Sequence, residues 1–289
     1  MEETFCADSV WADFVSLAGK NPDAAFQKEK LRVLESVDST NAALLRELAL
    51  SPVLVDDSHS LTDAGRLMHK TVLASAHQTS GRGRSGRVFY SPEKSGIYFS
   101  FVWIPESDVI DPAMYTVSAA VGVSRAIEAV CAKESKIKWV NDIYVGDKKV
   151  CGILTEGFCR AESGKLEALV VGIGINLTMG FEGVSREVIG KAGGIFSEDE
   201  KPAEDLRSKL LASSLHEIFS ILDSGGNVVD EYRQKSMLKG KLVHVHPLAG
   251  ASDEGYDATV LDISDDAGLL VRLSDGTKHV LNSGEVTLH

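Results

Sequence analysis

The chain has 289 residues, of which 44% are hydrophobic and 25% are charged, a composition typical of a globular protein with a substantial core. Its 30 basic and 42 acidic residues give a formal net charge of −12, which disfavours broad binding to a nucleic-acid backbone. The sequence shows no apolar run of about 18 residues and no signal-peptide pattern at its start. We therefore expect a cytoplasmic protein that binds neither membranes nor nucleic acid.

The hydrophobic pattern predicts alternating helices and strands over the first half of the chain. Helices are expected around residues 10–18, 38–49 and 112–133, and strands around 31–37, 71–78 and 96–104. Asp38 or Ser39 can cap the second helix, with Ala42, Leu45, Leu48 and Ala49 as its apolar positions. Residues 51–70 show no clear period and are expected to form a loop or insertion.

The second half is predicted to contain a strand at 137–140, a hairpin over 141–158 and a core strand at 166–177. Two helices should follow, at 204–223 and 228–238. The pattern then changes to short strands separated by Gly/Asp turns, at 241–247, 256–263, 269–274 and 278–283. This change predicts a small, separate all-β module at the end of the chain.

The four cysteines form no CxxC pair and no spacing typical of metal ligands; they are Cys6, Cys131, Cys151 and Cys159. This pattern indicates reduced thiols packed as small apolar side chains. His244 and His246 alternate onto one strand face, and without further ligands they indicate a surface pair.

The segment GRGRSGR, Gly81–Arg87, combines three glycines with three arginines directly before a predicted buried strand. Glycine permits close backbone approach, and arginine supplies fork-shaped donors for phosphate or carboxylate. The segment is not a P-loop, because GxxxxGK[ST] requires a lysine followed by a hydroxyl residue. These residues indicate a loop that closes over an anion; a solvated loop whose arginines pair with surface carboxylates is the alternative.

A second cluster of polar residues surrounds the predicted hairpin. Lys138 and Lys149 flank it and can both point into one cleft, where a lysine would stabilise charge that develops during phosphoryl or nucleotidyl transfer. Asn141 and Asp142 can orient a nucleotide or a magnesium ion. A solvated lysine pair beside a turn is the alternative interpretation.

Ser39 and Thr40 stand at the start of the second predicted helix. Hydroxyl residues at this position commonly serve only as a helix cap. The functional alternative places both hydroxyls, together with the helix N-terminus, against a small polar ligand.

Five motifs in this order resemble those of the biotin protein ligases, the biotin–[acetyl-CoA-carboxylase] ligase family. They are DSTN (38–41), GRGRSGR (81–87), KWVND (138–142), KKVCGILTE (148–156) and VVGIGINL (170–177). The resemblance implies an α+β fold related to class II aminoacyl-tRNA synthetases, with helices flanking a mixed sheet. It implies an N-terminal extension over 1–30, a catalytic domain over 31–238 and an SH3-like β-barrel over 239–289.

The family resemblance also implies a two-step reaction that uses ATP and Mg²⁺. The carboxylate of biotin attacks the α-phosphate of ATP, giving biotinyl-5′-AMP and pyrophosphate. A lysine of biotin carboxyl carrier protein, a subunit of acetyl-CoA carboxylase or a related carboxylase, then attacks the mixed anhydride and releases AMP. Family members can dimerise through a strand edge, so a homodimer is a further expectation.

The resemblance assigns a role to each matching position. Arg84 would hold the adenylate and limit its escape, and Lys149 would contact the biotin carboxylate and the α-phosphate. Biotin would be held by Ser39, Thr40, Gln78, Gly81, Arg82, Gly152 and Gly174. ATP would be held by Arg87, Phe89, Lys138, Asn141, Asp142 and Asn176, and any Mg²⁺ bound with ATP would lie near Asp142.

The sequence departs from the family pattern at two positions. Val140 replaces a frequent proline, and Phe89 replaces a tryptophan that often covers the adenine; the aromatic face is kept, so adenine stacking is still expected. Only 38 residues precede Ser39, too few for the winged helix-turn-helix that many members carry, so we expect a ligase that does not bind DNA.

Three other functions compete with biotin ligation, one of which is binding of biotin by a non-catalytic protein. A lipoate- or octanoate-protein ligase or transferase shares the core fold, but the GRGRSGR loop and the C-terminal β module favour biotin. A biotin-responsive regulator is the second alternative, and the lack of an expected DNA-binding module opposes it.

Overall fold

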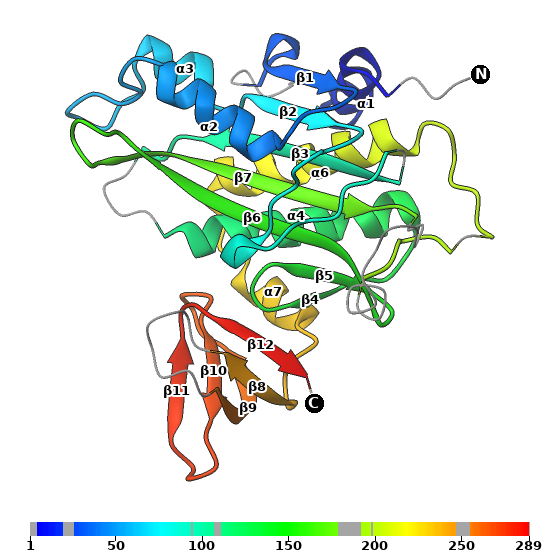
Figure 1. Cartoon of the computed structure of the whole chain (residues 1–289), viewed down its shortest axis with the longest axis vertical. Coiled ribbons are helices and arrows are strands. Elements are labelled where there is room, and N and C mark those ends of the chain that lie inside the picture. Colours follow the sequence, from blue (N-terminus) through cyan, green and yellow to red (C-terminus); the bar gives the residue numbers. More distant parts are fainter. Residues whose placement is uncertain are drawn as a thin grey trace.

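The computed structural model describes residues 5–19, 26–93, 95–106, 111–178, 192–197, 199–246 and 255–288. Two sheets organise this part of the chain (Figure 1). A seven-stranded mixed sheet has helices on both faces, and a five-stranded antiparallel sheet is formed by the C-terminal residues. The predicted α+β class with a C-terminal β module is confirmed.

The large sheet has the strand order β1-β2-β3-β7-β6-β5-β4. It is mixed because β1 and β2 run parallel, whereas every other neighbouring pair is antiparallel. The strands are β1 (Leu31–Leu34), β2 (Val72–Ser75), β3 (Gly96–Trp103), β4 (Lys136–Lys138), β5 (Asp142–Val145), β6 (Lys148–Cys159) and β7 (Leu166–Asn176).

Helices cover the two faces of this sheet unequally. Three long helices, α1 (Ala7–Ala18), α4 (Pro112–Cys131) and α6 (Leu206–Ser224), pack on one face, and α2 (Thr40–Leu50) packs on the other (Figure 1). Shorter helices are α3 (Asp63–Met68) and α7 (Val229–Lys235), with 3₁₀ turns at Lys28–Lys30 and Arg84–Gly86. Among the described helices, none is long and apolar enough to cross a bilayer.

The alternation of side chains along β3 and β7 divides the core in two. Phe99, Phe101 and Ile173 join the large core under α4 and α6. Val102 and Val170 point to the opposite face and pack with the leucines of α2. The smaller core leaves one end of the α2 face open to polar residues and glycines.

The C-terminal sheet has the order β11-β10-β9-β8-β12. Its strands are β8 (Leu242–His246), β9 (Tyr256–Ile263), β10 (Leu269–Arg272), β11 (Lys278–Leu281) and β12 (Glu285–Leu288). Four of them match the expected strands, and β12 was not predicted. The rings of His244 and His246 lie side by side with centroids 4.7 Å apart, consistent with the predicted surface pair.

Two local expectations are wrong. Residues 51–70 are not all loop, because α3 begins after Thr62, whose hydroxyl accepts a hydrogen bond from the Gly65 amide at 3.0 Å. In α2, Ala49 is exposed, since the helix packs through Leu44 and Leu48 instead. The remaining predicted helices and strands lie close to their expected bounds.

Candidate active site

A patch without side chains lies on the α2 face of the large sheet. The register of β6 and β7 places Gly152 opposite Gly174, and we call this pair the glycine floor. The ring of Phe89 covers the floor: a Cβ atom built on Gly174 would lie 2.4 Å from the ring, and one on Gly152 would lie 3.1 Å away. The close approach of this aromatic ring therefore requires glycine at position 174.

Phe89 reaches the floor at the end of a closed loop. The Phe89 amide donates to the Gly81 carbonyl at 2.9 Å, and the Gly83 amide donates to the Arg87 carbonyl at 2.7 Å. Ser85, at the turn, adopts a left-handed conformation with φ of 55°. The GRGRSGR segment thus forms a narrow hairpin that returns the chain to the floor.

The three arginines of this loop each reach a different element. Arg82 forms an ion pair with Glu156 of β6 at 3.0 Å. Arg84 donates to the Asn141 side-chain oxygen and to the Gly284 carbonyl, both at 3.0 Å.

Arg87 pairs with Glu285 of β12 through both guanidinium nitrogens. This hydrogen-bonded pair raises the pKa of Arg87 and lowers the pKa of Glu285 below its usual range. The loop is therefore held by carboxylates and by the C-terminal sheet together. Two of its arginines pair with carboxylates, as the alternative interpretation of the GRGRSGR segment expected.

The N-terminus of α2 faces the base of the same loop. Ser39 caps the helix, accepting from the Ala42 amide at 3.4 Å. The Thr40 amide donates to Gln78 Oε1 at 2.9 Å, and Gln78 Nε2 donates to Ser91 Oγ at 3.0 Å. Gly81 fits against this group, because a Cβ there would lie 2.7 Å from Ser91 Oγ. These predicted biotin residues are close neighbours in the structure.

Lys149 brings a positive charge to the floor. Its Nζ lies 2.7 Å from Asp142 Oδ1, and a Cβ on Gly152 would lie 3.6 Å from that amine. Asp142 Oδ1 is buried and has no hydrogen bond to any residue that the structure describes, so this ion pair is its polar contact. The lysine amine is therefore held by one carboxylate, within reach of a ligand on the floor.

The other residues assigned to ATP lie on neighbouring strands. Lys138 of β4 is the register partner of Asp142 in β5. Asn141 donates to the Ile153 carbonyl at 2.9 Å while its oxygen accepts from Arg84. Asn176 follows Gly174 by two positions on the same face of β7. Phe89, assigned to adenine, lies instead over the two glycines assigned to biotin, and its contact with any nucleotide stays a prediction.

Sequence reasoning missed three polar residues that join these parts. Asn41, Ser100 and Glu156 form a hydrogen-bonded group between α2, β3 and β6, in which Asn41 and Ser100 are buried and Glu156 is partly exposed. Asn41 lies within DSTN and Glu156 within KKVCGILTE, so the motifs contained two of them. Ser100 carried no signal beyond a polar residue in an apolar strand.

A model described as the biotin/lipoate A/B protein ligase family matches residues 59–176, which include the loop, Lys149 and the glycine floor. Over this segment the chain is similar to the biotin/lipoate A/B protein ligase family.

Several members of this ligase family are similar in sequence. The bifunctional ligase/repressor BirA of Bacillus spizizenii is 40% identical over 107 residues, which are 37% of this chain and 32% of that protein. The biotin–[acetyl-CoA-carboxylase] ligase of Mycobacterium tuberculosis is 27% identical over 263 residues, covering 89% of this chain and 88% of that protein. The matches to the two Bacillus proteins span about a third of those proteins, 32% of each.

Solved structures show the same ligase fold. The biotin protein ligase from Aquifex aeolicus, in complex with biotin and ATP, superposes with a TM-score of 0.65 at 24% identity. The match covers 89% of this chain and 97% of the Aquifex chain. It confirms the fold inferred from the motifs.

Proposed function

We propose that this protein is an ATP-dependent biotin ligase that forms biotinyl-5′-AMP and transfers biotin to a lysine of a biotin carboxyl carrier protein. The observation that carries the proposal is the meeting of the Lys149 amine, the loop residue Phe89 and the glycine floor in one place. The relative from Mycobacterium tuberculosis, a biotin–[acetyl-CoA-carboxylase] ligase similar over most of both chains, supports it.

In the first step, a carboxylate oxygen of biotin bonds to the α-phosphorus of ATP, and the bond to the β,γ-pyrophosphate breaks. Cations aimed at the α-phosphate lower the barrier, because negative charge on its oxygens rises in the transition state. Lys149 is the fixed cation at the floor, and Arg84 is the loop cation nearest Asn141. Both are anchored before substrate arrives, so little reorganisation accompanies the reaction.

The expected Mg²⁺ fits one feature of this chain. Asp142 offers a buried carboxylate whose Oδ1 has the Lys149 amine, 2.7 Å away, as its polar contact, and carboxylate oxygens suit this hard cation. The described residues contain no cluster of three or more metal-binding side chains. Asp142 would therefore help hold a Mg²⁺ that is bound mainly by ATP phosphates, where the ion would neutralise phosphate charge.

In the second step, the ε-amine of the carrier lysine attacks the acyl carbon of the mixed anhydride. An amide forms, AMP leaves and the amine loses a proton. The loop limits water access to the anhydride before the carrier arrives, since Phe89 and the paired arginines close it over the floor. We keep the homodimer, the cytoplasmic location and the lack of nucleic-acid binding as predictions.

The test is ATP–pyrophosphate exchange driven by biotin, lipoate or octanoate at equal concentrations. Exchange with biotin alone supports the proposal, and exchange with lipoate or octanoate instead contradicts it in favour of the sister activity. Transfer is then measured with a carrier domain and its matched Lys→Arg variant at the acceptor position. Biotin on the wild-type carrier only, detected by mass spectrometry, is the expected result.

A further inference from the structure

Both cations that the proposed reaction uses rest on one short turn between β4 and β5. Arg84 donates to the Asn141 side-chain oxygen at 3.0 Å. The Lys149 amine lies 2.7 Å from Asp142 Oδ1. The two partners are consecutive residues, so the shape of this turn sets where the two positive charges lie relative to each other. Whatever holds the turn therefore also positions the charges that would act on the α-phosphate.

The contacts of Asn141 with β6 fix one side of this residue. Its Nδ2 donates to the Ile153 carbonyl at 2.9 Å, so its Oδ1 is the atom that accepts from Arg84. The Ile153 amide in turn donates to the Asn141 carbonyl at 2.9 Å. Because a peptide group is planar, this second bond fixes the peptide plane that follows the Asn141 Cα atom.

The peptide plane that precedes the Asn141 Cα atom is held from α7. The hydroxyl of Tyr232 donates to the Val140 carbonyl at 3.1 Å, and this tyrosine is completely buried. Burial raises the pKa of the Tyr232 hydroxyl, so the hydroxyl stays protonated and can donate at any pH near neutral. Fixing the Val140 carbonyl also fixes the Asn141 amide in the same plane, and with it the rotation about the N–Cα bond of Asn141.

The helix that carries Tyr232 is attached at both of its sides. Figure 1 shows α7 between the large sheet and the C-terminal sheet. Glu231 of α7 accepts from two guanidinium nitrogens of Arg125 in α4, at 2.6 and 3.0 Å. Arg233 of α7 donates to the Ile263 carbonyl of β9 at 2.7 Å. Tyr232 lies between these two contacts, so its hydroxyl is a fixed point for the turn.

We propose that Tyr232 is a positioning residue that, through Val140 and Asn141, holds the guanidinium of Arg84 in place for the α-phosphate. This inference rests on the proposed function and deepens it by adding a buried residue of α7. With both peptide planes fixed, the Asn141 side chain has one direction, and the guanidinium that it holds is in place before ATP binds. Without the tyrosine hydroxyl the preceding plane can turn, and the Asn141 side chain turns with it. The Gly284 carbonyl still holds the second nitrogen of Arg84, so the loss should be partial.

The first experiment compares Tyr232→Phe with the wild-type protein in biotin-dependent ATP–pyrophosphate exchange. We expect kcat to fall about tenfold and the KM values for biotin and ATP to change less than about twofold, since a misplaced cation acts mainly on the charged transition state. Tyr115→Phe is the matched control and should leave exchange unchanged. It removes the hydroxyl of a tyrosine in α4 that contacts Trp103, at the end of β3 away from the glycine floor. An unchanged kcat in Tyr232→Phe, or a changed KM without a change in kcat, overturns the inference.

Double-mutant cycles show whether Tyr232 acts through Arg84. In the Arg84→Met background, Tyr232→Phe should lower kcat further by less than about twofold, because the guanidinium that it positions is absent. In the Lys149→Met background the tenfold loss should remain, since the Ile153 amide still holds the plane that leads to Asp142. A tenfold loss in both backgrounds is the result of a general structural role and overturns the inference.

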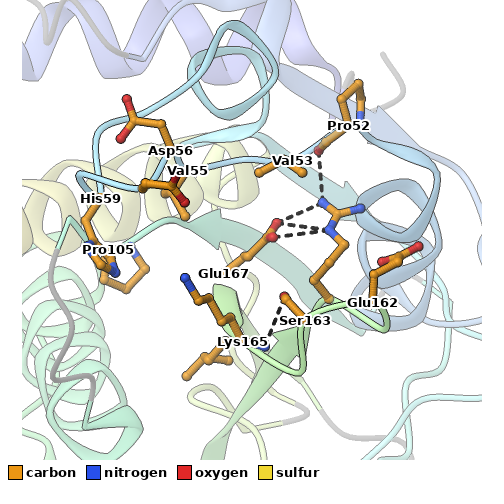
Figure 2. Close-up of a pocket in the computed structure, with 13 residues that line it drawn as sticks. Pro52, Val53, Val55, Asp56, His59, Pro105, Glu162, Ser163, Lys165 and Glu167 are labelled. Atoms are coloured by element: carbon orange, nitrogen blue, oxygen red, sulfur yellow. Dashed lines mark hydrogen bonds and ion pairs between the residues drawn. The ribbon is translucent and has the colours of Figure 1, made fainter.

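Limited trypsin digestion of the ligand-free protein separates this inference from the proposed function, because it requires no turnover. Cleavage after Arg84, measured from the fragment that begins at Ser85, should be several-fold faster in Tyr232→Phe than in the wild-type protein. Cleavage after Lys165 is the internal reference, since this exposed lysine lies in the turn between β6 and β7, beside the cavity in Figure 2 and at the far end of β6 from Gly152. A wild-type protein without exchange contradicts only the ligase activity. Unchanged cleavage after Arg84, or equally faster cleavage at both sites, contradicts the role of Tyr232.

Discussion

At the scale of single residues, the pairing of Lys149 with Asp142 sets both activity and stability. Lys149→Met keeps the length of the side chain and removes its charge. We expect biotin-dependent ATP–pyrophosphate exchange to fall about 100-fold or more, as when one preorganised donor is removed from a charged transition state. Unfolding free energy should also fall, by about 1–3 kcal/mol, because Asp142 keeps a buried, unpaired oxygen.

A double variant separates these two effects. Asp142→Asn in the Lys149→Met background removes the unpaired charge, so stability measured by chemical denaturation should recover while exchange stays low. Lys136→Met is the control, since this exposed lysine of β4 lies 3.8 Å from Glu134 and away from the floor. Wild-type exchange in Lys149→Met would contradict the role assigned to the lysine.

At the scale of elements, the glycine floor depends on one position in β7. Valine suits the extended backbone of a strand, but in the Gly174→Val variant the Cβ of the valine would overlap the Phe89 ring. We expect a loss of about 1–3 kcal/mol in unfolding free energy from this overpacking, measured by denaturant titration. Adding Phe89→Ala should restore most of the lost unfolding free energy, because it removes the ring that the new valine side chain overlaps.

The matched control for the floor is Ile175→Val. Ile175 is fully buried on the opposite face of β7. The variant should lose about 0.5–1.5 kcal/mol of unfolding free energy, and this loss comes only from the smaller side chain in the core. Phe89→Ala should not recover it. If Phe89→Ala restores the unfolding free energy in both Gly174→Val and Ile175→Val, or in neither, Phe89 does not occupy the floor in solution.

The elements that were predicted correctly are those whose pattern is long and regular. The helix beginning at Pro112 and the hairpin turning at Gly146 have clear periods and specific start or turn residues. α3 was missed because six residues are too short for a helical period to show, and its cap at Thr62 packs against the Val53–Leu54 segment. β12 was missed because its four residues follow a turn without an apolar run.

The candidate site was predictable only in part, because its residues come together through the sheet. The motifs located Thr40 and Lys149, and the family resemblance added Gln78 on a third segment; the structure brings these segments to one face. Nothing in the sequence shows that Ser100 would face Asn41, since that contact depends on the pairing of β3 with β7. The position of Phe89 depends on how the loop closes. The glycines of the loop allow several backbone conformations, so the sequence alone does not determine that closure.

At the scale of the whole molecule, the C-terminal sheet is joined to the loop as well as to the chain before it. Arg84 donates to the Gly284 carbonyl, Arg87 pairs with Glu285, and Trp139 donates to the Ala267 carbonyl at 2.9 Å. The sequence predicted a separate module, but these contacts connect it to the candidate active site. The state of the loop should therefore depend on residues about 200 positions away, such as Glu285, whose bond with Arg87 spans 198 positions.

Glu285→Gln tests this coupling between the C-terminal sheet and the loop. The variant keeps the shape of the side chain and loses its charge, so the loop should open more often and trypsin should cleave after Arg87 several-fold faster than in the wild-type protein. Global stability should change by only about 0–1 kcal/mol, because the ion pair is partly exposed. Asp265→Asn removes an exposed partner of Arg233 in the same part of the chain and should leave loop cleavage unchanged.

The pH dependence of this coupling follows from the pKa of Glu285. The hydrogen bond with Arg87 lowers that pKa below its usual value, so the folded state binds the proton less readily than the unfolded state. The stabilisation is therefore complete above about pH 4.5 and is lost as the pH falls through the lowered pKa. The small difference in melting temperature between the wild-type protein and Glu285→Gln should stay constant from pH 8 to 5 and shrink below pH 4. A difference that instead disappears between pH 6 and 8 would assign the coupling to a histidine.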